Sequence, residues 1–192
     1  SYKNAVISGV LDFTYMDDAL PKLPRKKRWY NSGNKSNKIE KIIKSKISFV
    51  NCTFEEDVLA YIPHEDSGYT FTASFNDDAI FKNCTFKEMA MFKYSDFEEK
   101  ASFEGTRFND VSTFKYTVFN NNVSFANTVF VETATFKYTK FKNGVSFNKA
   151  RFEEDLNIKY TKVSGRFDIT GMHVAYDINS KYTKINGQKF RY

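Results

Sequence analysis

Fourteen phenylalanines recur between residues 81 and 152 at intervals that alternate between five and six residues without a break. They are Phe81, Phe86, Phe92, Phe97, Phe103, Phe108, Phe114, Phe119, Phe125, Phe130, Phe136, Phe141, Phe147 and Phe152. The residue two positions earlier is usually small. A period near 5.5 wanders around a 3.6-residue helix and gives it no apolar face. Short extended segments fit instead, each with two inward side chains and a turn, stacked so that successive coils bury one core.

The outward-facing residues show how many such segments make one coil. Lys-Tyr follows Phe92, Phe114, Phe136 and Ile158, whereas the intervening apolar residues are followed by other pairs such as Glu-Gly. The outer pattern therefore repeats every 22 residues, which predicts a coil with four sides. Gly105, Asn127 and Gly171 fall in one column, as expected where a type II turn requires a positive φ. We expect about seven coils and a length of roughly 34 Å at ~4.8 Å per coil.

The rhythm of a small residue, Asn, Ser or Thr, and Phe ("CTF", "ASF", "VSF", "ATF") resembles the pentapeptide-repeat family. The resemblance covers about residues 47–187 and implies an all-β fold, the right-handed quadrilateral β-helix. It also implies a non-catalytic interaction module, since the best-studied members are DNA mimics that bind DNA gyrase. The chain departs from the usual 20-residue coil, because two sides of each coil carry an extra residue.

Two interruptions break the repeat, and we expect a single β-solenoid domain over residues 1–192 with two inserted loops. "NCTF" at 51–54 recurs at 83–86, so about ten residues are looped out near 60–70. "GVLDFT" at 9–14 resembles "GRFDIT" at 165–170 and is interpreted as the first strand. Phe49 follows Phe13 by 36 residues, which predicts a longer insertion at about 15–46. Within it, "NKIEKIIKSK" is consistent with a short helix capped by Asn37, with Ile39, Ile42 and Ile43 inward.

The net charge of +6 is unevenly distributed. Residues 21–46 hold ten Lys and Arg against Glu40 alone, so the rest of the chain is mildly acidic. The densest run lies beside the only tryptophan, which favours a partner-binding surface over a solvated loop with Trp29 packed on the coil below. The candidate residues are Lys22, Arg25, Lys26, Lys27, Arg28, Trp29 and Tyr30.

The Lys-Tyr pairs form a second candidate surface, a ladder pointing outward. Its residues are Lys93, Tyr94, Lys115, Tyr116, Lys137, Tyr138, Lys159 and Tyr160, continued by Lys181 and Tyr182. Such a strip is suited to a polyanion or a glycan. The structural interpretation is favoured over binding, because stacked tyrosines support one another. An acidic row at Glu88, Asp110, Glu132 and Glu154 would then neutralise the lysines.

Two inward columns are expected to be structural. Ser95, Thr117, Thr139, Thr161 and Thr183 occupy the small position, where their hydroxyls can hydrogen-bond along the stack. Cys52 and Cys84 share another column, but parallel Cβ vectors make poor disulfide geometry. We therefore predict buried, reduced thiols.

The sequence predicts a non-enzymatic scaffold for a macromolecular partner, with no catalytic residue, metal site or cofactor. We expect a protein partner, with nucleic acid or an anionic surface as alternatives for the basic insertion. A gyrase-binding DNA mimic and a glycan-binding cell-envelope protein are the rival functions. A homodimer through the C-terminal "GQKFRY" stays open. The chain begins at Ser1 without Met, which is compatible with a cytoplasmic protein or with export to the bacterial cell envelope after removal of a signal sequence.

Overall fold

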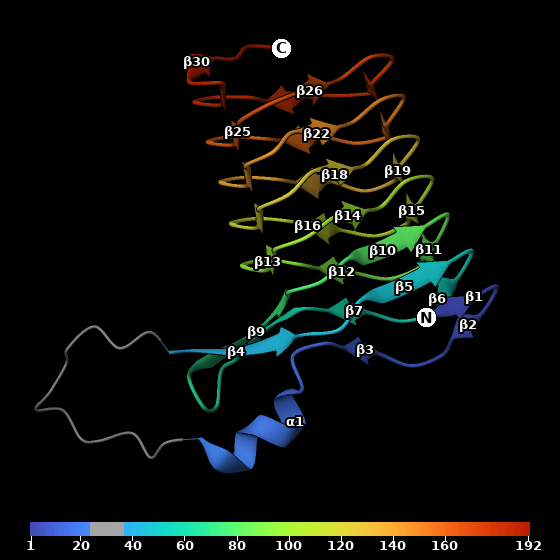
Figure 1. Cartoon of the computed structure of the whole chain (residues 1–192), viewed down its shortest axis with the longest axis vertical. Helices are drawn as coiled ribbons and strands as arrows, with labels where there is room; N and C mark the ends of the chain where they lie inside the picture. Colours follow the sequence, from blue (N-terminus) through green and yellow to red (C-terminus); the bar gives the residue numbers. More distant parts are fainter. Residues whose placement is uncertain (24–36) are drawn as a thin grey trace, which may run out of the picture.

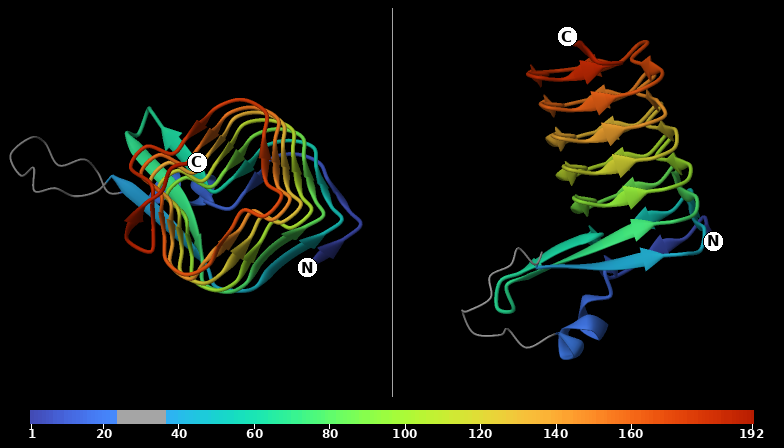
Figure 2. Two further views of the ribbon diagram at one scale, coloured as in Figure 1. Left: turned by 90° about the horizontal axis from the view of Figure 1, so that it is seen from above. Right: turned by 60° about the vertical axis from the view of Figure 1, so that its left-hand side comes forward.

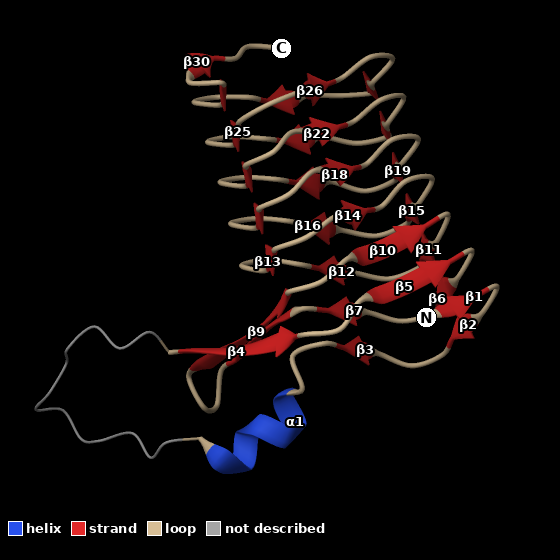
Figure 3. Cartoon of the chain, in the orientation of Figure 1, coloured by secondary structure: helices blue, strands red, loops and turns tan. Residues whose placement is uncertain are grey.

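The computed structural model describes residues 1–23 and 37–192. The chain winds through seven stacked coils, and Figure 1 shows them rising from the N-terminus to the C-terminus. Seen along the axis, the coils superimpose as a four-sided outline (Figure 2). The right-handed quadrilateral β-helix that the sequence predicts is therefore confirmed. Strands dominate the regular structure, as Figure 3 shows, and helix within the described residues is confined to α1 (Met16–Ala19) and the 3₁₀ turn η1 (Leu20–Lys22).

Each side of the coil contributes one strand to one of four parallel sheets, here called faces 1 to 4. Face 1 is built from β1 (Tyr2–Lys3), β5 (Ile47–Val50), β10 (Ala79–Lys82), β14 (Ala101–Ser102), β18 (Val123–Ser124), β22 (Val145–Ser146) and β26 (Phe167–Asp168). Face 2 is built from β2 (Val6–Ile7), β6 (Thr53–Phe54), β11 (Thr85–Phe86), β15 (Arg107–Phe108), β19 (Val129–Phe130), β23 (Arg151–Phe152) and β27 (His173–Val174).

Faces 3 and 4 complete the coil. Face 3 is built from β3 (Leu11–Asp12), β7 (Val58–Leu59), β12 (Ala90–Met91), β16 (Ser112–Thr113), β20 (Ala134–Thr135), β24 (Leu156–Asn157) and β28 (Ile178–Asn179). Face 4 is built from β4 (Lys38–Ile43), β9 (Tyr69–Phe75), β13 (Asp96–Phe97), β17 (Val118–Phe119), β21 (Lys140–Phe141), β25 (Lys162–Val163) and β29 (Lys184–Ile185). Two antiparallel strands are added to it, β8 (Tyr61–His64) beside β9 and β30 (Gln188–Lys189) beside β29.

The strand register confirms the 22-residue coil. Ala79 pairs with Ala101, and the same step of 22 relates the partners in every later coil. Between the second and third coils Phe54 pairs with Phe86, a step of 32 that agrees with the ten residues looped out of the second coil. The extra residue of each six-residue side lies at the corners that follow faces 2 and 4.

The register that the sequence predicts for the first coil is wrong. Tyr2 pairs with Phe49, so the first coil holds 25 residues more than a regular one. Leu11 and Asp12 form the third side of this coil, not its first, because β1 and β2 precede them. Every side shares the same alternation of inward and outward residues, and the first two sides lack the usual phenylalanines. The similarity of "GVLDFT" to a face 1 segment was therefore misleading.

The second half of the long insertion belongs to the solenoid. Residues 38–43, expected to be helical, are strand β4, which is the fourth side of the first coil and pairs with β9 over six residues. Its isoleucines recur at helical spacing, but β-branched residues suit a strand once a partner strand lies alongside. Ile43 packs against the core, whereas Ile42 points outward and is 37% exposed. The insertion is therefore shorter than 15–46.

The core is a stack of phenylalanine columns, and all fourteen phenylalanines of the repeat are buried. Phe114 lies between Phe92 and Phe136, with ring centroids 5.3 and 5.0 Å away and planes within 6° of parallel. Phe103 and Phe125, from another column, meet it edge-on at 5.3 and 5.2 Å. Both arrangements are favoured by the ring quadrupole, offset stacking along a column and edge-to-face contact across it.

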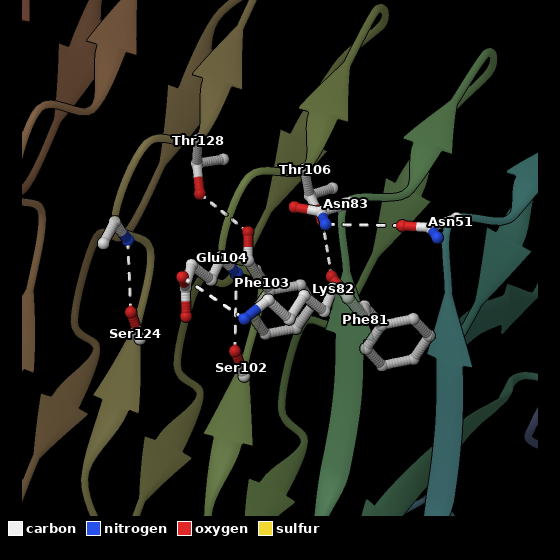
Figure 4. Close-up of polar contacts among 11 residues, drawn as sticks. Asn51, Phe81, Lys82, Asn83, Ser102, Phe103, Glu104, Thr106, Ser124 and Thr128 are labelled. Carbon is white, nitrogen blue, oxygen red and sulfur yellow. Dashed lines mark hydrogen bonds and ion pairs between the residues drawn. The ribbon is translucent and has the colours of Figure 1, made fainter. Parts of the chain in front are cut away.

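Buried hydroxyls and corner amides extend the stack with hydrogen bonds, as Figure 4 shows for the corner after face 1. Thr128 Oγ1 donates to the carbonyl of Phe103 in the preceding coil at 2.8 Å, and Asn83 Nδ2 donates to Asn51 Oδ1 at 3.3 Å. In the column predicted to hydrogen-bond along the stack, the hydroxyls of Thr117, Thr139, Thr161 and Thr183 donate in the same way. Ser95 is buried without such a partner. The carbonyl at the equivalent place, that of Ala60, accepts from Ala73 N instead.

Cys52 and Cys84 are free and buried, as predicted. The thiol of Cys84 lies 3.4 Å from the carbonyl of Phe49 and is 1% exposed. Burial, which disfavours the thiolate, raises the pKa of Cys84 to about 12. Among the described residues, no helix has the length and apolar character needed to cross a membrane.

The stacked core predicts a position-dependent loss of stability. Phe114→Ala should lower the free energy of unfolding by about 3–5 kcal/mol, because it leaves a cavity in the middle of a close-packed column. Phe190→Ala is the control, since Phe190 is partly exposed at the C-terminal end and its ring meets Phe167. Denaturant unfolding followed by circular dichroism measures both. Equal losses for the two variants would contradict a core built from continuous columns.

The raised pKa of Cys84 predicts a loss of stability at high pH. In the unfolded chain the thiol ionises near its ordinary pKa of 9.0, whereas in the folded protein it stays protonated to about 12. Wild type should therefore lose free energy of unfolding relative to Cys84→Ala as the pH rises from 9 toward 12. Parallel pH profiles for the two proteins would contradict this. An alkylation count at pH 8 should give no reactive thiol in native protein and two after denaturation.

Candidate interaction surfaces

The two interruptions of the repeat meet at one corner of the solenoid. Strand β9 pairs with β4 along residues 70–75 and with β8 along residues 69–72, on its opposite edge. These three strands, here called the extension, project beyond the four-sided outline (Figure 2). Segments that the sequence presents as two separate loops are thus one three-stranded sheet at the N-terminal end of face 4.

Helix α1 and η1 lie against β4. They share a shallow cavity whose walls come from Tyr15, Asp18 and Leu23 on one side and from Ile39 and Glu40 on the other. Lys41 Nζ lies 4.4 Å from the centroid of the Tyr15 ring. Of the predicted basic site, Lys22 is exposed at the end of η1. The other predicted members, Arg25, Lys26, Lys27, Arg28, Trp29 and Tyr30, fall outside the described residues.

The outer surface of the extension is polar and hydrogen-bonded. Ser74 Oγ donates to Glu40 Oε1 at 2.6 Å and accepts from the backbone N–H of Asp96 at 3.0 Å. Lys38 Nζ lies 3.2 Å from the same carboxylate oxygen. Burial raises the pKa of Asp96 above its ordinary value; the charge of Lys38 lowers this pKa, and that of Glu40 raises it further. These contacts link β4, β9 and β13 to one another.

The predicted Lys-Tyr ladder lies at the corner between faces 3 and 4. Each tyrosine occupies the third position of a turn closed by a hydrogen bond, as from Thr139 N to the carbonyl of Phe136 at 2.9 Å. This position requires positive φ, and Tyr94, Tyr116, Tyr138, Tyr160 and Tyr182 adopt values of 61° to 63°. The left-handed conformation costs an L-residue about 1–2 kcal/mol, so five tyrosines in it demand a compensating interaction.

Ring stacking supplies that compensation. Tyr116, Tyr138 and Tyr160 stack with centroids 4.7 and 4.6 Å apart and planes within 3° of parallel. Burial of its ring between these neighbours raises the pKa of Tyr138, and their phenol charges raise it further. Each lysine folds over its own tyrosine, with Nζ 5.0 to 5.3 Å from the ring centroid. Such contacts contribute about 0.5–1 kcal/mol at exposed sites.

The ladder is continuous with the extension. Lys93 Nζ donates to Tyr61 Oη of β8 at 3.0 Å, and the rings of Tyr61 and Tyr94 lie 5.9 Å apart. Sequence reasoning missed both Tyr61 and Tyr15, which has a φ of 53° and occupies the ladder position of the first coil. The signal for Tyr15 was present, because Phe13-Thr14-Tyr15 matches the Phe-Lys-Tyr corners of later coils.

The acidic row does not neutralise the ladder, contrary to the structural alternative considered from sequence. Glu88, Asp110, Glu132 and Glu154 follow the strands of face 2, so the width of face 3 separates them from the lysines. Within residues 1–23 and 37–192, no ion pair joins the two rows. The structure places the lysine side chains over aromatic rings instead.

The C-terminal segment folds back on the last coil. Strand β30 pairs with β29, and the ring of Phe190 meets that of Phe167 edge-on at 5.3 Å. Phe190 thereby covers part of the end of the core, whereas Tyr192 is 61% exposed.

Fold and surface together define a class, the quadrilateral β-solenoid whose columns repeat once per coil. Comparison with protein families agrees: a model described as pentapeptide repeats, with nine copies, matches residues 71–117 and 114–162. The chain belongs to the pentapeptide-repeat family through this solenoid. Searches of curated proteins and of solved structures returned no significant match.

The ladder geometry predicts that the Tyr138 position discriminates between side chains by shape. Tyr138→Val should be less stable than Tyr138→Asn by about 1–2 kcal/mol, because a β-branched residue is an outlier at positive φ whereas Asn tolerates it. Both variants lose the ring, so their difference isolates the backbone effect. Thermal and denaturant unfolding measure it. Equal stability would show that the corner relaxes to another conformation.

Proposed function

We propose that the protein is a non-catalytic scaffold that binds a partner protein through the extension at its N-terminal end. The main support for this proposal is that both interruptions of an otherwise regular repeat lie at the same corner of adjacent coils. In repeat proteins, insertions tend to map to one face, which is often the binding face. A solenoid that needed only to fold would keep its regular coil there.

The strands of the extension are suited to a protein partner. In the described part of the chain, β4 and β8 each pair with β9 alone, so each retains one edge without a neighbouring strand. Edge strands bind partner chains by strand addition. Ile42 adds an exposed apolar side chain beside the polar contacts of Glu40 and Ser74, a combination found at specific interfaces.

The gyrase-binding DNA mimic is a weaker proposal. Mimicry of a duplex needs a dense negative surface, and the corner between faces 3 and 4 carries a row of lysines instead. The glycan-binding proposal depends on the Tyr ladder, whose central ring faces are covered by one another. Neither is favoured over the extension.

A matched pair of substitutions tests the proposal. Ile42 and Val111 are similarly exposed, 37% and 40%, but lie on the extension and at the corner after face 2. Wild type, Ile42→Glu and Val111→Glu are used as baits in host lysate, with purified gyrase as a defined prey, and captured proteins are quantified by mass spectrometry. We expect a prey that wild type and Val111→Glu retain and that Ile42→Glu loses at least tenfold.

Two outcomes would contradict the proposal. One is a prey set that Ile42→Glu retains in full, which would place binding elsewhere on the solenoid. The other is loss with Val111→Glu alone. Unfolding curves for all three proteins show whether any loss comes from destabilisation rather than from the surface.

A further inference from the structure

Basic and acidic residues lie mainly on different faces of the last three coils. Faces 3 and 4 of these coils, with the C-terminal segment, comprise residues 134–144, 156–166 and 178–192, here called the basic flank. The basic flank contains ten Lys and Arg residues and no Asp or Glu. Its members are Lys137, Lys140, Lys142, Lys159, Lys162, Arg166, Lys181, Lys184, Lys189 and Arg191. Faces 1 and 2 of the same coils, residues 123–133, 145–155 and 167–177, contain six acidic and two basic residues.

The strand register places like charges side by side on the basic flank. Lys140 pairs with Lys162, which in turn pairs with Lys184, and all three side chains are exposed. Like charges directly opposite one another on neighbouring strands are destabilising. At two other places opposite charges lie together instead, since Lys82 pairs with Glu104 and Lys87 with Glu55 across adjacent coils. A structural role does not account for the lysine column.

Counter-ions from the protein itself are scarce on the basic flank. Among the described residues, only Arg166 of this set forms an ion pair, with Asp168 at 3.0 Å. Lys142 donates to a neutral amide, Asn120 Oδ1, at 2.6 Å. The remaining positive charges have no carboxylate bound to them in this part of the structure, and those of Lys137, Lys159 and Lys181 lie over tyrosine rings. An external anion would remove their mutual repulsion.

The shape of the basic flank is a ridge with cations on both sides. The stacked rings of Tyr138, Tyr160 and Tyr182 form its crest, because the sequence Lys-Tyr-Thr-Lys recurs at this corner in all three coils. One lysine of each repeat precedes the tyrosine on face 3, and the other begins the strand on face 4. Two parallel rows of three lysines thus run along the axis, spaced by ~4.8 Å.

The stacked rings of the crest leave no room for a base to insert between them. Tyr138 and Tyr160 lie 4.6 Å apart, and Tyr160 and Tyr182 4.8 Å apart, so no planar base fits between them. Parting the rings would break hydrogen bonds between coils. Asn157 and Asn179, the polar amides of face 3 here, already accept from the backbone N–H of Lys159 and Lys181. The surface therefore offers charge without side chains arranged to read a base.

We propose that the basic flank binds the phosphate backbone of a nucleic-acid duplex without reading its sequence. Ten basic groups over three coils correspond to about one per 1.4 Å of axis, and duplex DNA carries one negative charge per ~1.7 Å. A straight, rigid array of point charges matches a straight, rigid polyanion, whereas a flexible acidic peptide would lose conformational entropy on it. Exposed aliphatic groups that would anchor a membrane are lacking on the described residues of this surface. The surface lies at the opposite end of the solenoid from the extension (Figure 1).

Salt-dependent binding to a labelled 20-base-pair duplex tests the proposal by fluorescence anisotropy. The test variant carries Lys159→Gln, Lys162→Gln, Lys181→Gln and Lys184→Gln. The control variant removes the same charge on the N-terminal coils with Lys3→Gln, Lys46→Gln, Lys82→Gln and Lys87→Gln. Each phosphate contact contributes about 0.9 to the slope of log K against log salt, so the test variant should reduce the slope by about 2 to 4 and the affinity at least tenfold. The control variant should change neither by more than a small fraction.

Each remaining outcome overturns the proposal. Wild type that shows no binding at 50 mM salt would refute the proposal outright. Equal losses in the test and control variants would leave net charge as the only effect. Tighter binding of single-stranded DNA would assign the surface to bases rather than to a duplex. Stronger competition by polyglutamate, sulfated glycan or anionic vesicles than by unlabelled duplex would assign it to another partner. Circular dichroism at each salt concentration verifies that the variants are folded.

Discussion

Parallel strand pairing at a fixed step of 22 residues is the constraint on which the rest of the structure depends. It places each residue beside its counterpart one coil away, so that a property of one position becomes a property of a whole column. Phenylalanine in four inward columns produces a core of stacked and edge-on rings. Threonine at the small position produces hydrogen bonds between coils, because its hydroxyl reaches the carbonyl of the coil before. A short repeated pattern of inward residues thereby produces a continuous rod.

The same constraint repeats unfavourable features. A tyrosine at positive φ would be an isolated outlier in most proteins, but here five of them lie in register. Each tyrosine ring supplies the stacking surface that stabilises the next one. The strain of the positive φ and the ring stacking that offsets it therefore both arise from the same 22-residue repeat. For the lysines of face 4 the repeat gives repulsion without a compensating contact between them. Lys140, Lys162 and Lys184 lie side by side along the column, which Val118 precedes. The physical difference is that rings attract when stacked and ammonium groups do not.

Individual residues show where sequence reasoning succeeded and where it failed. The phenylalanine spacing predicted the coil length, and "NCTF" predicted the size of the second interruption, because inward residues and register obey strict rules. The predicted register of the first coil was wrong. Tyr2 and Ile7 stand where later coils have phenylalanine, and the sequence around Phe13 resembled that of another column. The helix predicted at residues 38–43 was wrong for a different reason. Their isoleucine spacing fits a helix in isolation, and only the presence of β9 makes the strand the better state.

By itself the sequence determined the architecture of this protein: a 22-residue, four-sided coil with a phenylalanine core, a glycine or asparagine corner, an outward Lys-Tyr ladder and two reduced thiols. These follow from periodicity, which needs no knowledge of distant contacts. The tertiary structure alone decided that two interruptions form one extension and that Tyr61 joins the ladder. It also decided that acidic and basic segments, which alternate along the chain, separate onto opposite faces of the last coils. Such features depend on which segments become neighbours across coils, and closure of the solenoid fixes those neighbours in space.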